Sequence, residues 1–197
     1  MTARRRSRSR QNRVWAGVVA GLGLILLAAA IALYARRMDT RSKAAEEVPA
    51  GPVQNPPAVV DLPAPELELT TLDGQPASLA DYRGQVLIVN LWATWCPPCK
   101  AEMPDLLAYY EDHKDEGLAL VAINIQEPAE RVRPFVEAYG LTFPVWLDPK
   151  GTSTMAFRTQ GLPSTFVIDP EGRIRLIWYG RTSRELLEQY VTPMLGQ

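Results

Sequence analysis

Two long apolar runs stand out in the middle part of the chain. Residues 85–92 and 118–125 are apolar at almost every position, and a glycine precedes each run. Runs of this length are typical of strands that are buried on both faces of a sheet. Four shorter strands are predicted from alternation and from neighbouring turn residues: 66–69, 144–148, 164–169 and 173–179.

Helices are predicted between these strands. From residue 98 to residue 115, apolar side chains recur at helical spacing, and Pro104 is expected to kink this helix. Strand–helix–strand units followed by a hairpin and a last helix predict an α/β domain with a mixed central sheet flanked by helices on both faces. Further helical segments are predicted at 78–82, 129–139, 151–157 and 183–195.

The N-terminal region has a different pattern. Residues 14–35 form an uncharged run of 22 residues, with Trp15 and Tyr34 near its ends and six arginines between residues 4 and 13. As a helix, this run would be about 33 Å long, enough to cross a hydrocarbon core of about 30 Å. The positive charge before the run predicts that the N-terminus stays in the cytoplasm and that the remaining chain lies outside it.

These patterns predict a membrane-anchored protein. A cleaved signal peptide is the alternative, because small residues near Ala30 and Ala32 fit a cleavage site. The run is longer than the core of a usual signal peptide, which favours an uncleaved anchor. Four regions are predicted: a basic cytoplasmic segment at 1–13, a transmembrane helix at 14–35, a proline-rich linker at 36–60 and a globular domain at 61–197.

The balance of charged residues also differs between the N-terminal regions and the predicted globular domain. Residues 1–60 hold ten Lys or Arg against three Asp or Glu, whereas residues 61–197 hold eleven against nineteen, a net charge of −8. An acidic domain is a poor candidate for binding nucleic acid. We interpret its acidic surface mainly as a solvated face.

The two cysteines of the chain are three positions apart, in the segment Trp95-Cys96-Pro97-Pro98-Cys99. A bridge across so short a loop removes little chain entropy, so it stabilises a fold far less than a long-range disulfide. The spacing lets one sulfur attack a partner while the other waits to release it. We therefore predict a redox-active disulfide rather than a structural one.

The position of this pair indicates a role for each sulfur. Cys96 falls where a buried strand gives way to a helix, and the N-terminus of a helix stabilises an anion. A thiolate there should have a depressed pKa, so Cys96 is the predicted nucleophile and Cys99, one turn along, the resolving cysteine. Pro97 and Pro98 suit the first helical turn and stiffen the loop. Trp95 is expected to shield the site and to offer a flat apolar contact to a partner.

Three further residues bear on the predicted site. Glu102 follows the second cysteine by three positions on the same helix face, where a carboxylate can accept and donate protons during exchange. An exposed helix glutamate is an equally weighted alternative. Asn90 is a polar residue inside an apolar strand and is predicted to hydrogen-bond near the site. Pro163 begins a strand after a tight turn, where an X–Pro bond can be cis.

Other chemistries are weaker interpretations of these residues. A zinc site needs four ligands, and the chain offers two cysteines and one histidine. Covalent haem attachment needs a histidine directly after the second cysteine, where this chain has Lys100. The one histidine, His113, lies among charged residues and is predicted to be a solvated surface residue. We expect no metal and no cofactor beyond the disulfide itself.

Two segments carry a resemblance to a known family. Residues 89–104, VNLWATWCPPCKAEMP, resemble the active-site segment of thioredoxin-fold proteins, and residues 161–166, GLPSTF, resemble their cis-proline segment. Both motifs at this separation are more specific than a lone pair of cysteines. The resemblance covers roughly residues 61–197 and implies a thioredoxin-like fold for that domain.

Within this family, the chain is similar to the membrane-anchored, extracytoplasmic ResA/TlpA branch. The anchor, the insert before Pro163 and the acid at Glu102 indicate this branch. Thioredoxins carry an aspartate where this chain has Asn90, so the resemblance implies that Glu102 takes over proton handling. It also implies that Pro163 is cis and faces Cys96, with the Leu162 backbone pairing with the bound partner.

The resemblance implies an anchored reductase of protein disulfides outside the membrane. Apocytochrome c is the frequent substrate in this branch, and a membrane electron-donor protein is the frequent reductant. A disulfide-donating oxidase of the same fold stays open, because the Pro97-Pro98 pair does not settle the redox poise. A peroxidase of the peroxiredoxin type is a weaker alternative, since that class needs Thr or Ser where Ala93 stands. A non-enzymatic anchored binding module is a further alternative.

Overall fold

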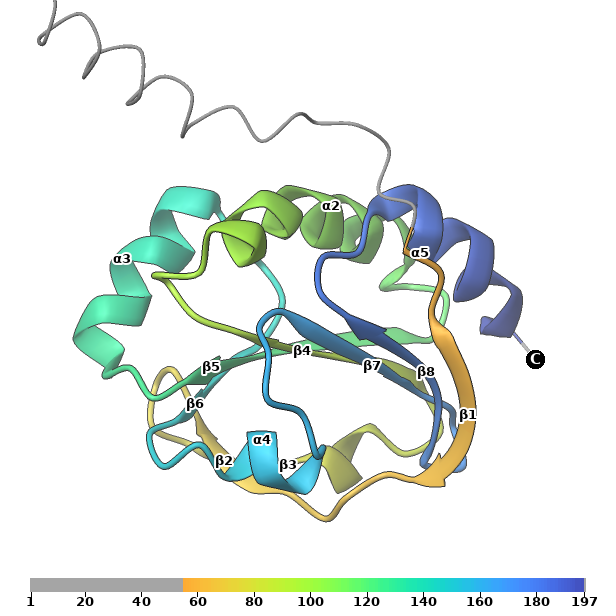
Figure 1. The fold of residues 1–197 in the computed structure, drawn as a ribbon, viewed down its shortest axis with the longest axis horizontal. Coiled ribbons are helices and arrows are strands. Elements are labelled where there is room, and N and C mark those ends of the chain that lie inside the picture. Colours follow the sequence, from red (N-terminus) through yellow and green to blue (C-terminus); the bar gives the residue numbers. More distant parts are fainter. Residues whose placement is uncertain (1–54, 197) are drawn as a thin grey trace, which may run out of the picture. The chain divides into compact units, whose positions relative to one another are not determined.

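A mixed eight-stranded sheet forms the centre of the structure, a computed structural model that describes residues 55–196 (Figure 1). The predicted segments 1–13 and 14–35 and most of the predicted linker lie outside these residues. The strand order is β1-β8-β7-β4-β5-β6-β2-β3. The strands are β1 (Ala58–Pro63), β2 (Glu68–Thr71), β3 (Pro76–Ser78), β4 (Val86–Trp92), β5 (Leu118–Ile125), β6 (Val145–Asp148), β7 (Ser164–Ile168) and β8 (Arg173–Tyr179).

The two apolar runs form the middle of the sheet, as predicted. Every residue of β4 and β5 is buried, and the two strands pair in parallel from Val86 opposite Leu118 to Trp92 opposite Asn124. β6 continues the parallel part, whereas β7 and β8 are antiparallel to their neighbours. Two helices, α2 (Pro97–His113) and α3 (Ala129–Tyr139), connect β4 to β5 and β5 to β6. Both connections step across the sheet in one direction, so right-handed crossovers place both helices on the same face.

Helices cover the two faces unequally. Figure 1 shows α2, α3 and α5 along one face of the sheet and the short α4 on the opposite side. On the first face, Ile88 and Trp92 share a buried cluster with Met103 of α2, and on the second, Leu91 shares one with Phe157. The helices are α2 (Pro97–His113), α3 (Ala129–Tyr139), α4 (Thr152–Ala156) and α5 (Arg184–Tyr190), with 3₁₀ turns η1 (Leu79–Tyr82) and η2 (Thr192–Met194).

Most predicted elements are confirmed within a residue or two. Pro104 lies inside α2, with helical residues on both sides. The predicted last helix divides at Val191 into α5 and the turn η2. Among the helices of residues 55–196, none is long and apolar enough to cross a membrane.

The sequence missed the edge strand β1. Its first three residues fall inside the predicted linker, yet Ala58 pairs with Ile177 of β8. Most of the strand is exposed, so it lacks the alternation of a half-buried strand. Its support comes from far along the chain, since Asp61 forms ion pairs with Arg173 and with Arg175, the latter at 3.1 Å. The short strand β3 was missed as well.

Candidate active site

The two cysteines form a disulfide at the start of α2. The S–S bond is 2.08 Å long and joins Cα atoms 5.3 Å apart. Cys96 is the N-cap residue of the helix, and its sulfur accepts a 3.3 Å hydrogen bond from the Cys99 backbone N–H. This is the predicted placement: Cys96 sits against the positive end of a helix dipole.

The surface around the disulfide is uneven. Cys96 keeps 3% of its surface exposed and Cys99 keeps none. Pro97 and Pro98 occupy the first helical turn, as predicted, and both are exposed. Trp95 is 64% exposed, which is unusual for so large an apolar side chain. A partner that approaches the disulfide meets Cys96 before Cys99 and finds an apolar surface beside it.

Glu102 is fully buried, which rules out the alternative of an exposed helix glutamate. Its carboxyl accepts a 2.7 Å hydrogen bond from the Asn90 side-chain amide and a 3.1 Å hydrogen bond from the Thr182 backbone N–H. Asn90 also donates to the Thr165 hydroxyl at 3.0 Å. Asn90 therefore hydrogen-bonds near the site, as predicted. It belongs to a buried hydrogen-bond network whose residues come from β4, α2, β7 and the segment after β8.

Burial raises the pKa of Glu102 to about 8, although the hydrogen bonds from Asn90 and Thr182 oppose that shift. A carboxyl with this pKa exchanges protons near neutral pH. It lies one helical turn after Cys99 on the same face, and both side chains are buried. The arrangement can accept a proton from a thiol and return it.

The peptide bond between Leu162 and Pro163 is cis. Pro163 directly precedes β7, whose first residue, Ser164, lies opposite Leu91 near the end of β4. The Pro163 carbonyl accepts a 2.9 Å hydrogen bond from the Gly180 N–H. The pairing of β7 with β4 brings the predicted cis-proline segment to the end of the sheet from which the cysteine loop emerges.

A groove runs between Trp95 and the segment that contains α4. Trp95 and Leu162 both line it, so the structure brings together two residues predicted to bind substrate. Its volume is about 580 Å³, and Met155 of α4, 79% exposed, adds a second apolar surface. Asp148 holds α4 in place, since its buried carboxylate accepts hydrogen bonds from the backbone N–H groups of Thr152 and Ser153 at 2.9 and 2.7 Å.

Two residues of this groove adopt a left-handed backbone conformation. Gln126 has a φ of 58° and Arg158 a φ of 53°, and both line the groove. Every other positive φ in the described part of the chain belongs to a glycine. Such a conformation costs a non-glycine residue about 1–3 kcal/mol and is concentrated at functional sites.

A buried carboxylate also fixes the loop before Cys96. Glu127 accepts hydrogen bonds of 2.6 Å from both the backbone N–H and the hydroxyl of Thr94. The side-chain amide of Asn124, in β5, donates to the same carboxylate at 2.9 Å. The loop between β4 and α2 is thereby tied to the neighbouring strand.

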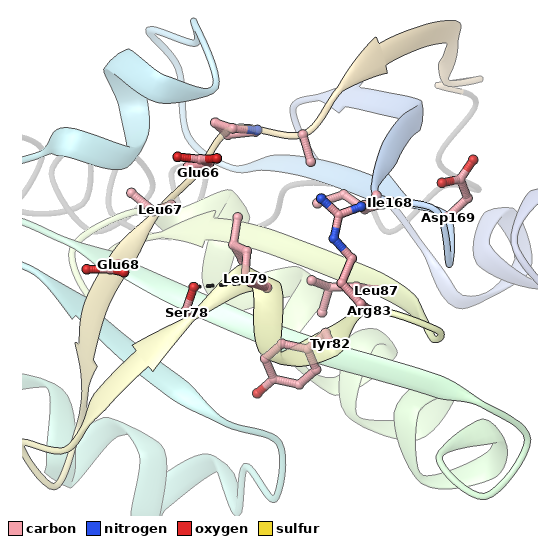
Figure 2. Close-up of a pocket in the computed structure, with 14 residues that line it drawn as sticks. Glu66, Leu67, Glu68, Ser78, Leu79, Tyr82, Arg83, Leu87, Ile168 and Asp169 are labelled. Atoms are coloured by element: carbon pink, nitrogen blue, oxygen red, sulfur yellow. Dashed lines mark hydrogen bonds between the residues drawn. The ribbon is translucent and has the colours of Figure 1, made fainter.

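A second hollow, of about 200 Å³, lies at the opposite end of β4. Figure 2 shows its lining, which includes Leu87 at the start of that strand, Arg83 and Asp169. Its lining residues include neither cysteine nor histidine. Across residues 55–196, no cluster of acidic, cysteine or histidine side chains is suited to hold a metal ion.

Comparison with known proteins identifies the family. The family model described as AhpC/TSA matches residues 60–177. This chain belongs to the AhpC/TSA family. Over 128 residues, this chain is 38% identical to the thiol-disulfide oxidoreductase ResA of Geobacillus kaustophilus. The match covers 65% of this chain and 74% of the relative.

Solved structures agree with this membership. A structure assigned to the thiol:disulfide interchange protein DsbE of Chlorobium tepidum matches with a TM-score of 0.65 and 28% identity, over 71% of this chain and 100% of that chain. StoA from Bacillus subtilis matches with a TM-score of 0.57 and 29% identity, over 65% of this chain and 97% of its own. This AhpC/TSA member is a thiol–disulfide oxidoreductase of the ResA type with a thioredoxin-like fold.

One prediction about the neighbourhood of α2 is wrong. The side chain of His113 is only 13% exposed, and it lies 2.7 Å from Glu116 and 3.2 Å from Glu188. It therefore joins the end of α2 to α5 instead of pointing into solvent. The charged residues around it in sequence suggested a solvated face, whereas its acidic partner on α5 is 75 residues away.

Several residues of the site were missed from the sequence. Asn124 breaks an apolar strand just as Asn90 does, so it gave a usable signal for the Glu127 cluster. The sequence offers no such signal for Thr165, Thr182 or Arg158. Only the folded chain shows that the two threonines contact Asn90 and Glu102 and that Arg158 lines the groove.

Proposed function

We propose that this protein is a membrane-anchored, extracytoplasmic reductase of protein disulfides. The observation that supports this mechanism most strongly is the buried Glu102 carboxyl one helical turn after Cys99, on the helix whose N-terminus carries Cys96. This arrangement provides a stabilised thiolate, a resolving thiol and a group that moves the proton between them.

In the first step, the Cys96 thiolate attacks one sulfur of the partner's disulfide. A bond forms between Cys96 and that sulfur, the partner's own S–S bond breaks, and the departing partner thiolate takes a proton. Cys99 then gives its proton to the Glu102 carboxylate and attacks the Cys96 sulfur. The Cys96–Cys99 bond forms, the bond between Cys96 and the partner breaks, and the second partner sulfur leaves as a thiolate that takes the proton held by Glu102. Two electrons have then passed to the partner.

The surrounding residues take positioning roles in this proposal. Trp95 gives the partner an apolar contact, and Pro97 and Pro98 hold the first helical turn rigid beneath the sulfurs. The Leu162 backbone pairs with the extended partner chain next to Pro163. The exposure of Trp95 and its shared groove with Leu162 support these roles.

The N-terminal sequence supports the proposed location. Residues 14–35 span the membrane, residues 1–13 stay in the cytoplasm, and the linker at 36–60 passes into strand β1 as the thioredoxin-like domain begins. A membrane electron-donor protein with a dithiol returns Cys96 and Cys99 to the reduced state. Apocytochrome c, before its haem is attached, is the proposed substrate, supported by the resemblance to the ResA/TlpA branch.

The test combines a potential with a trapping experiment. A reduction potential near about −270 mV supports the reductase, and one near about −120 mV supports the disulfide-donating oxidase instead. A Cys99→Ser variant should accumulate covalent adducts on Cys96 in cells, whereas a Cys96→Ser variant should not. A membrane-impermeant maleimide should label the reduced cysteines of intact cells if the domain lies outside the cytoplasm. No adduct and no labelling would contradict the proposal.

A further inference from the structure

We propose that Arg158 makes this enzyme prefer protein disulfides with an acidic residue close to the attacked cysteine. The inference rests on the proposed reduction of protein disulfides and adds a substrate preference to it. Arg158 lines the groove that starts at Trp95, directly before the nucleophile, and ends at Leu162, directly before the cis-proline. A polypeptide that presents its disulfide to Cys96 therefore has neighbouring residues within this groove.

Arg158 is the one charged residue among the side chains that line the groove. It is also the only arginine within residues 55–196 that has no hydrogen-bonded or ion-paired side chain. The other seven arginines form an ion pair with a carboxylate or a hydrogen bond to a carbonyl: Arg83, Arg131, Arg133, Arg173, Arg175, Arg181 and Arg184. In a domain with a net charge of −8, an unpaired guanidinium in the groove that Trp95 also lines is available for a carboxylate from a partner.

The backbone holds Arg158 firmly at this position. Its neighbours Phe157 and Thr159 are both buried: Phe157 packs on Phe166 with ring centroids 4.4 Å apart, and the Thr159 hydroxyl lies 2.8 Å from that of Ser164. Between these two anchors, Arg158 is exposed and left-handed, with a φ of 53°. A glycine would adopt that conformation without strain, so a long cation at this position indicates that the side chain has a use.

The expected occupant is an extended polypeptide segment that flanks the target cysteine. One of its apolar side chains rests between Trp95 and Met155, two large apolar residues that are otherwise open to solvent. Its acidic side chain reaches the Arg158 guanidinium. Trp95 thus provides apolar contact to any partner, while Arg158 discriminates among partners by charge.

The experiment uses the full-length reduced protein in detergent micelles and a set of isomeric peptides. Each peptide has one internal disulfide and a single Asp, which is moved through the four positions on either side of the cysteines, so all have the same net charge. Two further series carry Asn or Lys in place of Asp at the same positions. We measure the rate constant of disulfide reduction for wild type, Arg158→Gln, Arg158→Glu and Lys150→Glu. Lys150 is exposed and lies outside the groove, so its variant matches the charge change.

We expect wild type to favour Asp over Asn at one position by roughly two- to fivefold, the effect of an exposed ion pair. Arg158→Gln should abolish this preference, Arg158→Glu should transfer it to Lys, and Lys150→Glu should keep it. Added salt should reduce it. If wild type reduces all isomers equally, or Arg158→Glu still favours Asp, the inference fails while the reductase function stands. If no peptide is reduced at all, the proposed function fails and the inference with it.

Discussion

The side-chain amide of Asn90 donates a 2.7 Å hydrogen bond to the buried carboxyl of Glu102. Asn90 belongs to the central strand β4 and Glu102 to the helix that carries both cysteines, so this bond joins the core of the sheet to the site. In the resemblance to thioredoxins, an aspartate occupies the position of Asn90. Here that position holds an amide, and the acid has moved onto the helix next to Cys99.

The first prediction concerns this amide. Asn90→Ala removes a donor that favours the charged form of Glu102, so the pKa of Glu102 should rise further, by about one unit. The pH at which the mixed disulfide resolves should rise with it. Stopped-flow measurement of this step from pH 6 to 10 tests the shift. Thr165→Val removes the other partner of Asn90 and should leave the profile nearly unchanged, whereas an unshifted profile for Asn90→Ala would contradict the role.

The second prediction concerns stability and pH. The pKa of Glu102 rises from 4.5 to about 8 on folding, chiefly through burial. Between these pH values the native protein holds a proton that the unfolded chain has lost, so the free energy of unfolding falls as the pH rises. The loss reaches at most about 5 kcal/mol, from 1.36 kcal/mol per pKa unit. Glu102→Gln should flatten this slope in urea unfolding of the oxidised protein and leave it more stable than wild type at pH 8.

The same variant should lose activity. A glutamine cannot accept the Cys99 proton, so resolution of the mixed disulfide should slow by about 100-fold. The first attack by Cys96 should change little, because Glu102 acts on the second sulfur. A variant that is more stable at pH 8 yet slower in the second step separates proton handling from a packing defect.

The middle of the sheet and the reactive helix could be predicted because local pattern decides them. β5 and α3 end at the predicted residues, since a nearly continuous apolar run marks the limits of β5 and a C-terminal glycine, Gly140, marks the end of α3. The cysteine pair was recognisable because its spacing and its place at the strand–helix junction both serve the same chemistry. The local sequence signals of these residues agree with their role in the folded protein, so this part of the site could be predicted.

The remainder depends on contacts across long stretches of sequence. Strand β1 exists because β8 pairs with it, and nothing in its own exposed residues requires a strand. His113 is held by Glu188 on α5, and the Thr94 loop by Glu127 beyond β5. No short-range pattern shows such partners. The two cysteines could therefore be predicted from the sequence, whereas many of the residues that position them could not.

The third prediction concerns His113. Burial lowers its pKa, but the hydrogen bonds and charges of Glu116 and Glu188 raise it more, so the folded pKa lies above 6.5. The stabilisation is therefore complete below pH 6.5 and is lost as the pH rises through the folded pKa. His113→Gln should destabilise the domain by less than about 1 kcal/mol at pH 5.5 and not at pH 9. Urea unfolding in a Glu102→Gln background isolates this change, and equal losses at both pH values would contradict it.

The last prediction concerns the loop before Cys96. Glu127 accepts hydrogen bonds from three donors: the backbone N–H and hydroxyl of Thr94 and the amide of Asn124. Glu127→Gln replaces the charged acceptor by a neutral amide, whose nitrogen cannot accept, so the Thr94 hydroxyl must turn to accept from it. The expected loss of stability is about 1–3 kcal/mol, because hydrogen bonds to a charged group stabilise more than those to a neutral one.

This substitution should also affect reactivity, because the freed loop directly precedes the nucleophile. We expect slower reaction of Cys96 with a partner disulfide and an unchanged second step by Cys99, since the Glu102 network is separate. Arg131→Gln is the matched control: its guanidinium lies 3.9 Å from Glu127 on the exposed side, so its loss should change neither rate nor stability by much. If Glu127→Gln slowed both steps equally, the carboxylate would be supporting the fold as a whole instead of positioning the Cys96 loop.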